Sequence, residues 1–131
     1  MNIKGIARDT LIFIMESARS TMPYEFAGLL RAEEGIITEV LMLPGTESSN
    51  KGALIRLYML PNMRVVGSVH SHPSENLRPS PADLSFFSRT GDHHIIVCPP
   101  FDMESWVCYN AAGRKRDLKL FDVEFDDEGW L

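Results

Sequence analysis

The segment Gly67-Ser68-Val69-His70-Ser71-His72-Pro73 carries two histidines separated by one residue at the end of a short run that favours a strand. Residues two apart on a strand point to the same face of the sheet. His70 and His72 should therefore present two imidazoles side by side, while Ser71 points the other way. Two imidazoles on one face indicate the beginning of a zinc site, because zinc binds imidazole nitrogens at about 2.0–2.1 Å.

A catalytic zinc needs a third protein ligand and one open position for water. Asp83 can supply the ligand, because it lies in the first turn of a helix that should begin near Ser80. The run from Ser80 to Asp83 also has the features of an ordinary helix start, with Ser as N-cap, Pro81 at the first helical position and an acid at the third. The zinc ligand and the helix start are compatible, because the cap fixes the helix that carries the ligand.

The spacing of these residues resembles a family motif. His70-x-His72, seven residues, Ser80, two residues and Asp83 match the JAMM motif H-x-H-x(7)-S-x(2)-D at every defined position. The chain therefore resembles the JAMM (MPN-plus) zinc metallopeptidases, most closely their short archaeal and bacterial members. The resemblance implies a single-domain α/β fold of the MPN type, similar to that of cytidine deaminases. Such a fold has a curved mixed sheet, an N-terminal helix and a second helix after the zinc-ligand loop.

The same resemblance implies a role for each site residue. One zinc per chain would be held by His70, His72 and Asp83. Glu25, expected on an early strand, would accept a proton from the attacking water and pass it to the leaving amine. Ser80 would help to stabilise the tetrahedral oxyanion. The implied reaction is hydrolysis of the isopeptide or peptide bond after the tail of a ubiquitin-like (β-grasp) modifier or sulfur-carrier protein.

By analogy with relatives, the substrate groove is expected along the loop 44–52 and a strand 53–60, beside which an extended tail could add as a strand. A non-catalytic MPN scaffold for protein assembly is the alternative, although such relatives usually lack the ligands. A zinc deaminase would need an H-x-E and a P-C-x-x-C signature. The chain has neither, since Cys98 is followed by Pro99-Pro100.

Other candidate groups have ordinary structural explanations. His93 and His94 are adjacent on a predicted strand, so they face opposite sides and cannot hold one ion together. Ser71 lies between the two site histidines but points away from them, and Trp106 is expected in the core. The thiols of Cys98 and Cys108 are expected to be reduced and partly buried. A disulfide between them across a hairpin is the alternative.

The composition favours one soluble domain spanning residues 1–131. The chain is 44% hydrophobic and 24% charged, with a formal net charge of −5, which argues against nucleic acid as a partner. The basic run Arg114-Lys115-Arg116 indicates a turn that leads into a strand. The N-terminus fits neither a signal peptide nor a membrane span, so a cytoplasmic location without membrane partners is expected.

The hydrophobic pattern predicts two helices and several strands around a single mixed sheet. The helices are expected over about 6–20 and 80–89. Strands are expected over 24–30, 36–43, 53–60, 64–70, 94–98, 106–110 and 115–125. A homodimer could form through surface apolar residues such as Phe86, Phe87, Trp130 and Leu131, but one-sided packing of the second helix explains the first two more simply.

Overall fold

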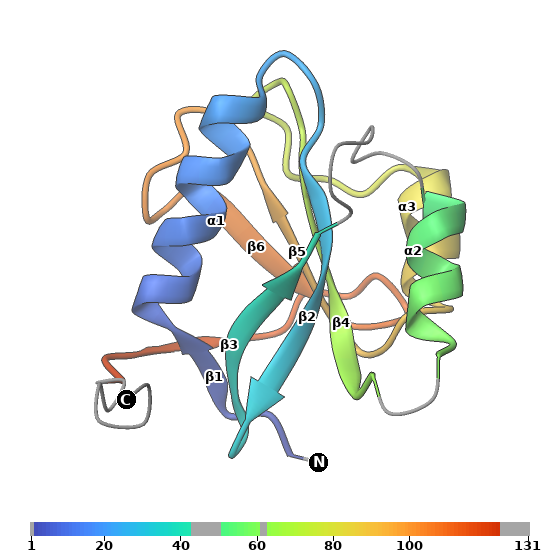
Figure 1. Ribbon diagram of the computed structural model, residues 1–131. Helices are drawn as coiled ribbons and strands as arrows, with labels where there is room; N and C mark the ends of the chain where they lie inside the picture. The colour runs from blue at the N-terminus through green and yellow to red at the C-terminus, as the bar shows by residue number, and fades with distance from the viewer. Residues whose placement is uncertain (1, 43–50, 61–62, 124–131) are drawn as a thin grey trace.

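The computed structural model describes residues 2–42, 51–60 and 63–123, and these form one mixed sheet of seven strands with three helices (Figure 1). The strand order is β6-β5-β4-β2-β3-β1-β7. The strands are β1 (Gly5–Ala7), β2 (Ala27–Glu33), β3 (Ile36–Leu41), β4 (Val65–Ser71), β5 (His93–Val97), β6 (Trp106–Tyr109) and β7 (Lys119–Phe121). The helices are α1 (Arg8–Thr21), α2 (Lys51–Tyr58) and α3 (Pro81–Phe87). The architecture confirms the predicted mixed sheet.

Strand β4 is an interior strand of the sheet, antiparallel to β2 on one side and parallel to β5 on the other. The hairpin of β2 and β3 turns at Glu34 and Gly35, which both have positive φ. Strand β1 is parallel to both of its neighbours, β3 and β7. The C-terminal end of β4 carries the motif histidine His70, so the site lies at one end of an interior strand.

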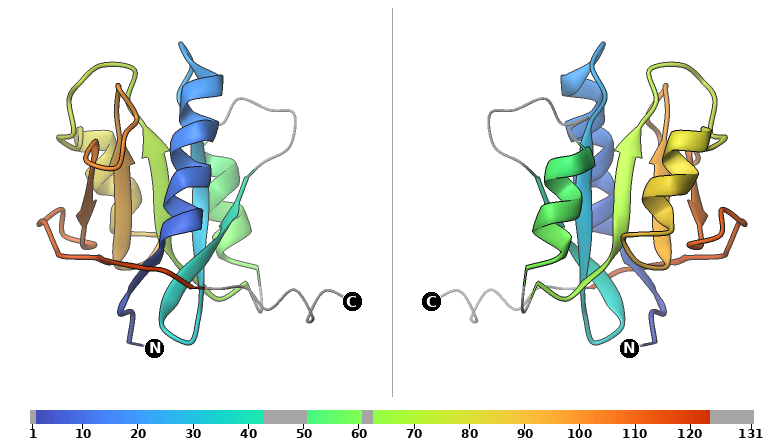
Figure 2. Two further views of the ribbon diagram at one scale, coloured as in Figure 1. Left: turned by 90° about the vertical axis from the view of Figure 1, so that its left-hand side faces the viewer. Right: turned by 90° about the vertical axis from the view of Figure 1, so that its right-hand side faces the viewer.

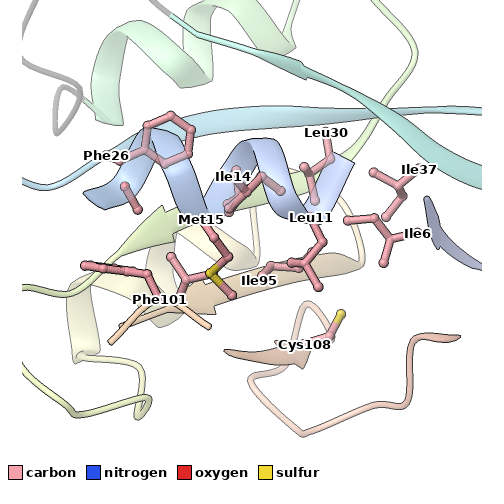
Figure 3. Close-up of a cluster of buried hydrophobic side chains, with 13 residues drawn as sticks. Ile6, Leu11, Ile14, Met15, Phe26, Leu30, Ile37, Ile95, Phe101 and Cys108 are labelled. Atoms are coloured by element: carbon pink, nitrogen blue, oxygen red, sulfur yellow. The ribbon is translucent and has the colours of Figure 1, made fainter. Parts of the chain in front are cut away.

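Helices cover both faces of the sheet, with α1 on one face and α2 and α3 on the other (Figures 1 and 2). Alternating side chains of each strand therefore enter different cores: Leu30 and Ile95 face α1, and Leu29 and Ile96 face the other layer. Figure 3 shows the core under α1. Its labelled members are Ile6, Leu11, Ile14, Met15, Phe26, Leu30, Ile37, Ile95, Phe101 and Cys108.

The helix α1 forms as the sequence predicted, because Leu11, Ile14, Met15 and Ala18 recur at helical spacing and are all buried. Its start differs from the prediction: Ile6 belongs to β1, and the helix begins only at Arg8. The short strand escaped prediction because three residues show no periodicity of their own.

The strand predicted over 53–60 is wrong, because this segment is the helix α2. Its apolar residues at positions 54, 57 and 58 have helical spacing. Leu54 is fully buried in the core on the α3 side of the sheet. A short apolar run fits both periods, and packing decides between them. Of the predicted loop 44–52, residues 43–50 lie outside the described residues.

The segment predicted as a strand over 115–125 is strand only from Lys119 to Phe121 within the described part, which ends at residue 123. The basic run before it follows a turn, as expected: the amide of Gly113 donates to the carbonyl of Asn110 at 2.9 Å. Arg116 then forms an ion pair with Asp92 at 2.8 Å. Arg116 therefore links the segment before β7 to the residue that precedes β5.

Cys98 and Cys108 are both free and buried. In the β5–β6 register Cys108 lies opposite Ile95, whereas the amide of Cys98 bonds to the carbonyl of Ser105. The two thiols are thus three positions out of register, and the disulfide left open by the sequence does not form. Burial raises the pKa of Cys108 to about 12, so this thiol stays protonated.

Two further expectations concern the surface. Phe86 and Phe87 are buried in the core under α3, which confirms the simpler explanation over a dimer contact through them. Trp130 and Leu131 lie outside the described residues. Within 2–42, 51–60 and 63–123, no helix combines the length and apolar character needed to cross a membrane.

Candidate metal centre

The two motif histidines meet at the end of β4. His70 is the penultimate residue of the strand and is buried, and His72 follows the strand and is partly exposed. Their Nε2 atoms lie 3.1 Å apart, with ring centroids separated by 4.9 Å. The alternation of the strand therefore places both imidazoles on one side, as the spacing predicted.

Asp83 reaches the same point from the first turn of α3. One carboxylate oxygen, Oδ1, lies 3.3 Å from Nε2 of His70, and the other, Oδ2, lies 3.3 Å from Nε2 of His72. The side chain is almost fully buried, with 3% of the residue exposed. A carboxylate at this depth beside two imidazoles indicates a shared cation or a shared proton, because an uncompensated buried charge is costly.

The helix cap orients this carboxylate. Ser80 is the N-cap of α3: its hydroxyl oxygen accepts from the Asp83 amide at 3.1 Å, and its own amide donates to Asp83 Oδ2 at 2.8 Å. Pro81 opens the helix after the cap. The capping box that the sequence predicted is therefore present, and the same carboxylate closes it while facing the histidines.

The donor set fits zinc. Ligands bound tetrahedrally at about 2.0–2.1 Å lie about 3.3 Å from one another, close to the three separations among His70, His72 and Asp83. Nδ1 of His72 lies 2.6 Å from the carbonyl oxygen of Asn76, which can only accept, so Nδ1 carries the proton. In the neutral ring Nε2 is then an unprotonated ligand atom that faces His70 and Asp83.

Glu25 completes the cluster from a third segment. It lies two residues before β2 rather than on the strand, and it is partly buried. A carboxylate oxygen of Glu25 and ring nitrogens of His70 and His72 lie within 4.8 Å of one another. The structure thus brings together Glu25, His70, His72 and Asp83, with Ser80 at the rim.

Ser71 has a role that the sequence did not reveal. Its hydroxyl oxygen accepts from the Phe26 amide at 2.7 Å, and its amide donates to the Phe26 carbonyl at 2.8 Å. This pair ties the residue after Glu25 to the residue between the two histidines. Ser71 points away from the imidazoles, as predicted, and holds the segment that carries Glu25.

The charge around His72 is set by its carboxylate neighbours. The hydrogen bond with Asp83 raises the pKa of His72, and partial burial opposes this effect. The carbonyl of Asn76 and the charge of Glu25 act in the same direction as Asp83. The centre therefore attracts a positive charge, whether a proton or a metal ion.

The remaining histidines lie beside the site rather than in it. His94 faces the α3 side, where its ring nitrogens bond to Ser68 and Gly91. His93 faces the other side, and its Nε2 atom is buried without a hydrogen-bond partner within the described part of the chain. Trp106 packs against the core under α1 and donates to the Met103 carbonyl, in agreement with its predicted core role.

The chain is similar in sequence to known proteins. A family model described as prokaryotic homologs of the JAB domain matches residues 8–109. A protein of Haloferax volcanii, described as a probable metalloprotease, is 40% identical over 136 residues, covering 95% of this chain and 84% of its own length.

The chain is also similar to solved structures. One, described as JAMM, a metalloprotease-like zinc site in the proteasome and signalosome, has a TM-score of 0.76 at 39% identity and covers 92% of this chain and 100% of its own. A JAB1/MPN domain protein from Archaeoglobus fulgidus has a TM-score of 0.75 at 40% identity, covering 90% and 99%. A protein from Desulfitobacterium hafniense, at 20% identity and a TM-score of 0.61, shares the fold over 91% and 93%.

Proposed function

The chain belongs to the JAB-domain family as a short member of the JAMM type, and we propose that it is a zinc metalloprotease acting after the tail of a ubiquitin-like protein. The observation that carries the proposal is the meeting of two imidazole nitrogens and a buried carboxylate, 3.1–3.3 Å apart, beside a second carboxylate. Two histidines and one carboxylate form a ligand set that is common in catalytic zinc sites and leaves one position open.

His70, His72 and Asp83 would hold one zinc ion per chain. When bound, zinc polarises the scissile carbonyl and lowers the pKa of a coordinated water towards about 7. The cap at Ser80 and the bond from His72 to Asn76 hold two of these side chains in place before any metal arrives. Such preorganisation favours tight binding, because little order has to be gained.

Glu25 is placed to move protons. It is proposed to accept a proton from the attacking water and to deliver it to the nitrogen of the leaving amine. Its half-buried position against the two imidazoles keeps the carboxylate within reach of both events. In an isopeptide the leaving group is a lysine ε-amine, which must be protonated to depart.

Ser80 is proposed to donate to the oxyanion. Its hydroxyl oxygen already accepts from the Asp83 amide, so its own proton remains available for donation. The residue is exposed at the rim of the site, where a substrate carbonyl can reach it. Donors aimed at a developing oxyanion typically contribute about 3 kcal/mol to the stability of the transition state.

The substrate is proposed to be the extended C-terminal tail of a β-grasp modifier or sulfur-carrier protein, in the cytoplasm. An added strand beside 53–60 is excluded, because that segment is helical. Tyr24, next to Glu25, is 75% exposed, and Met42 lies beyond the end of β3 that pairs with the start of β2. These two apolar side chains offer a surface for a tail that approaches the site.

The proposal is tested with a β-grasp protein joined through its C-terminal tail to a lysine ε-amine, and with a matched fusion through an α-amine. Zinc-loaded wild type should cleave at the end of the tail. Glu25→Gln should retain zinc and lose about 100- to 10,000-fold in kcat, because only the proton transfer is removed.

Glu33→Gln is the matched control, since Glu33 is exposed at the far end of β2. It should cleave like the wild type. Full activity in Glu25→Gln would remove the proposed base. Zinc-loaded wild type that cleaves neither fusion would overturn the ubiquitin-like substrate and favour the non-catalytic scaffold.

A further inference from the structure

His94 lies behind the proposed ligands and takes no part in the proposed chemistry. It is fully buried on β5, in register with Ser68 of β4. Val69 and Ile95 face the core under α1, so Ser68, His70 and His94 all face the opposite side, towards α3. The ring is therefore a buried polar group on the strand beside β4, on the same face of the sheet as His70.

Both ring nitrogens of His94 are hydrogen-bonded. Nε2 lies 2.9 Å from the carbonyl oxygen of Gly91, an acceptor only, so Nε2 carries the proton. Nδ1 then accepts from the Ser68 hydroxyl at 2.7 Å. Burial lowers the pKa of His94 to about 4, which keeps the ring in this neutral form near pH 7. The bond to Ser68 connects His94 to β4, and the bond to Gly91 connects it to the turn between α3 and β5.

The flat face of the same ring holds α3. His94 and Phe87 stack with centroids 4.3 Å apart and planes 10° from parallel. Phe87 lies four residues after Asp83, hence on the same face of the helix. Its ring also lies 6.2 Å from that of His70. The contact therefore supports the helix face that presents the Asp83 carboxylate.

We infer that His94 is a positioning residue: it fixes β4, α3 and the turn after α3 relative to one another and so sets the separation of His70 from Asp83. This inference rests on the proposed zinc site. An apolar side chain could fill the same volume, but it could not bond to Ser68 and Gly91 together. His94 should thus act on metal affinity and turnover, beyond its share in the stability of the core.

The test compares His94→Phe, which keeps an aromatic ring but removes both hydrogen bonds, with His94→Gln, whose amide can restore both. The control is His93→Phe, because His93 is its neighbour on β5, is also buried, with 7% of the residue exposed, and faces the other side of the sheet. Zinc affinity is measured by competition with a chelator, site geometry by the visible spectrum of the cobalt-substituted protein, and turnover by kcat and KM.

His94→Phe should weaken zinc binding about tenfold, shift the cobalt spectrum and lower kcat with KM unchanged. His94→Gln should recover most of the zinc affinity, and His93→Phe should match the wild type in all three measurements. If His94→Phe does not fold, Ser68→Ala removes the link to β4 alone and should change affinity and spectrum in the same direction.

A folded His94→Phe or Ser68→Ala protein with wild-type zinc affinity, spectrum and kcat would overturn the inference while the proposed function stands. A wild-type protein that takes up neither zinc nor cobalt would overturn the proposed function itself, and the inference with it. Metal uptake by the wild-type protein therefore distinguishes failure of the inference from failure of the proposed function.

Discussion

Asp83 is bound from two directions at once. Its Oδ2 atom accepts from the Ser80 amide at 2.8 Å and also faces His72 at 3.3 Å, and its Oδ1 atom faces His70. The cap holds the carboxylate in a single orientation, so the ligand does not have to be ordered by the metal. At the scale of single residues, helix capping and the metal site are therefore one arrangement.

Substitutions at Ser80 separate the capping role from the catalytic one. Ser80→Ala should reduce the free energy of unfolding by about 1 kcal/mol, whereas Ser80→Gly should cost only a few tenths, because glycine is a tolerated N-cap. Both should lower kcat by about 100- to 1,000-fold, since both remove the hydroxyl donor. Denaturant unfolding and steady-state kinetics on zinc-saturated protein measure the two effects. Wild-type kcat in Ser80→Gly would refute the oxyanion role.

The sequence could indicate His70, His72, Ser80 and Asp83 because their signals are local: strand alternation for the pair and a capping box for the helix start. Glu25 was found only through a family resemblance, because it is far from the two histidines in the sequence. The bond between Ser71 and Phe26 was missed, because it depends on which strands become neighbours.

Helices with their own boundary signals were predictable at the scale of elements. α3 has its cap and proline, and α1 has a helical stripe that ends before Pro23. The helix α2 was mistaken for a strand, because its short apolar run has no comparable start signal and its identity comes from packing of Leu54 on the sheet. β1 was missed because its three residues become a strand only through β3 and β7.

The buried β5 residue His94 gives the fold a defined pH dependence. Its pKa is lowered from 6.5 to about 4 by burial, so the unfolded chain binds a proton more readily between these values. Its stabilising contribution is complete above pH 6.5 and is lost as the pH falls towards 4. The loss amounts to about 3 kcal/mol in the free energy of unfolding.

This prediction is checked by denaturant unfolding of the metal-free protein between pH 7 and pH 4, with His94→Phe as the reference. Burial and Arg116 also lower the pKa of His93, which acts in the same direction, whereas the raised pKa of His72 opposes it. The difference between the two proteins isolates His94. Parallel pH profiles for wild type and His94→Phe would contradict the assignment.

At the scale of the whole molecule, the site lies where the interior strand β4 ends. β4 has a neighbour on each side, and helices lie on both faces of the sheet, so His70 projects from one of the most constrained strands in the described fold. The mixed sheet could be anticipated from the alternation of helical and strand patterns. The strand order could not, because the pairing of β1 with β3 and β7 joins distant segments that carry no mutual signal in the sequence.

The most direct test of the central claim is the zinc content of the purified protein, measured by elemental analysis for wild type and for His72→Ala after equal exposure to zinc and removal of the unbound metal. His72 is partly exposed, so its replacement should leave the fold intact, which circular dichroism verifies. The account predicts about one zinc per wild-type chain and a large loss in the variant. Wild-type protein without zinc, or equal zinc in both proteins, would contradict it.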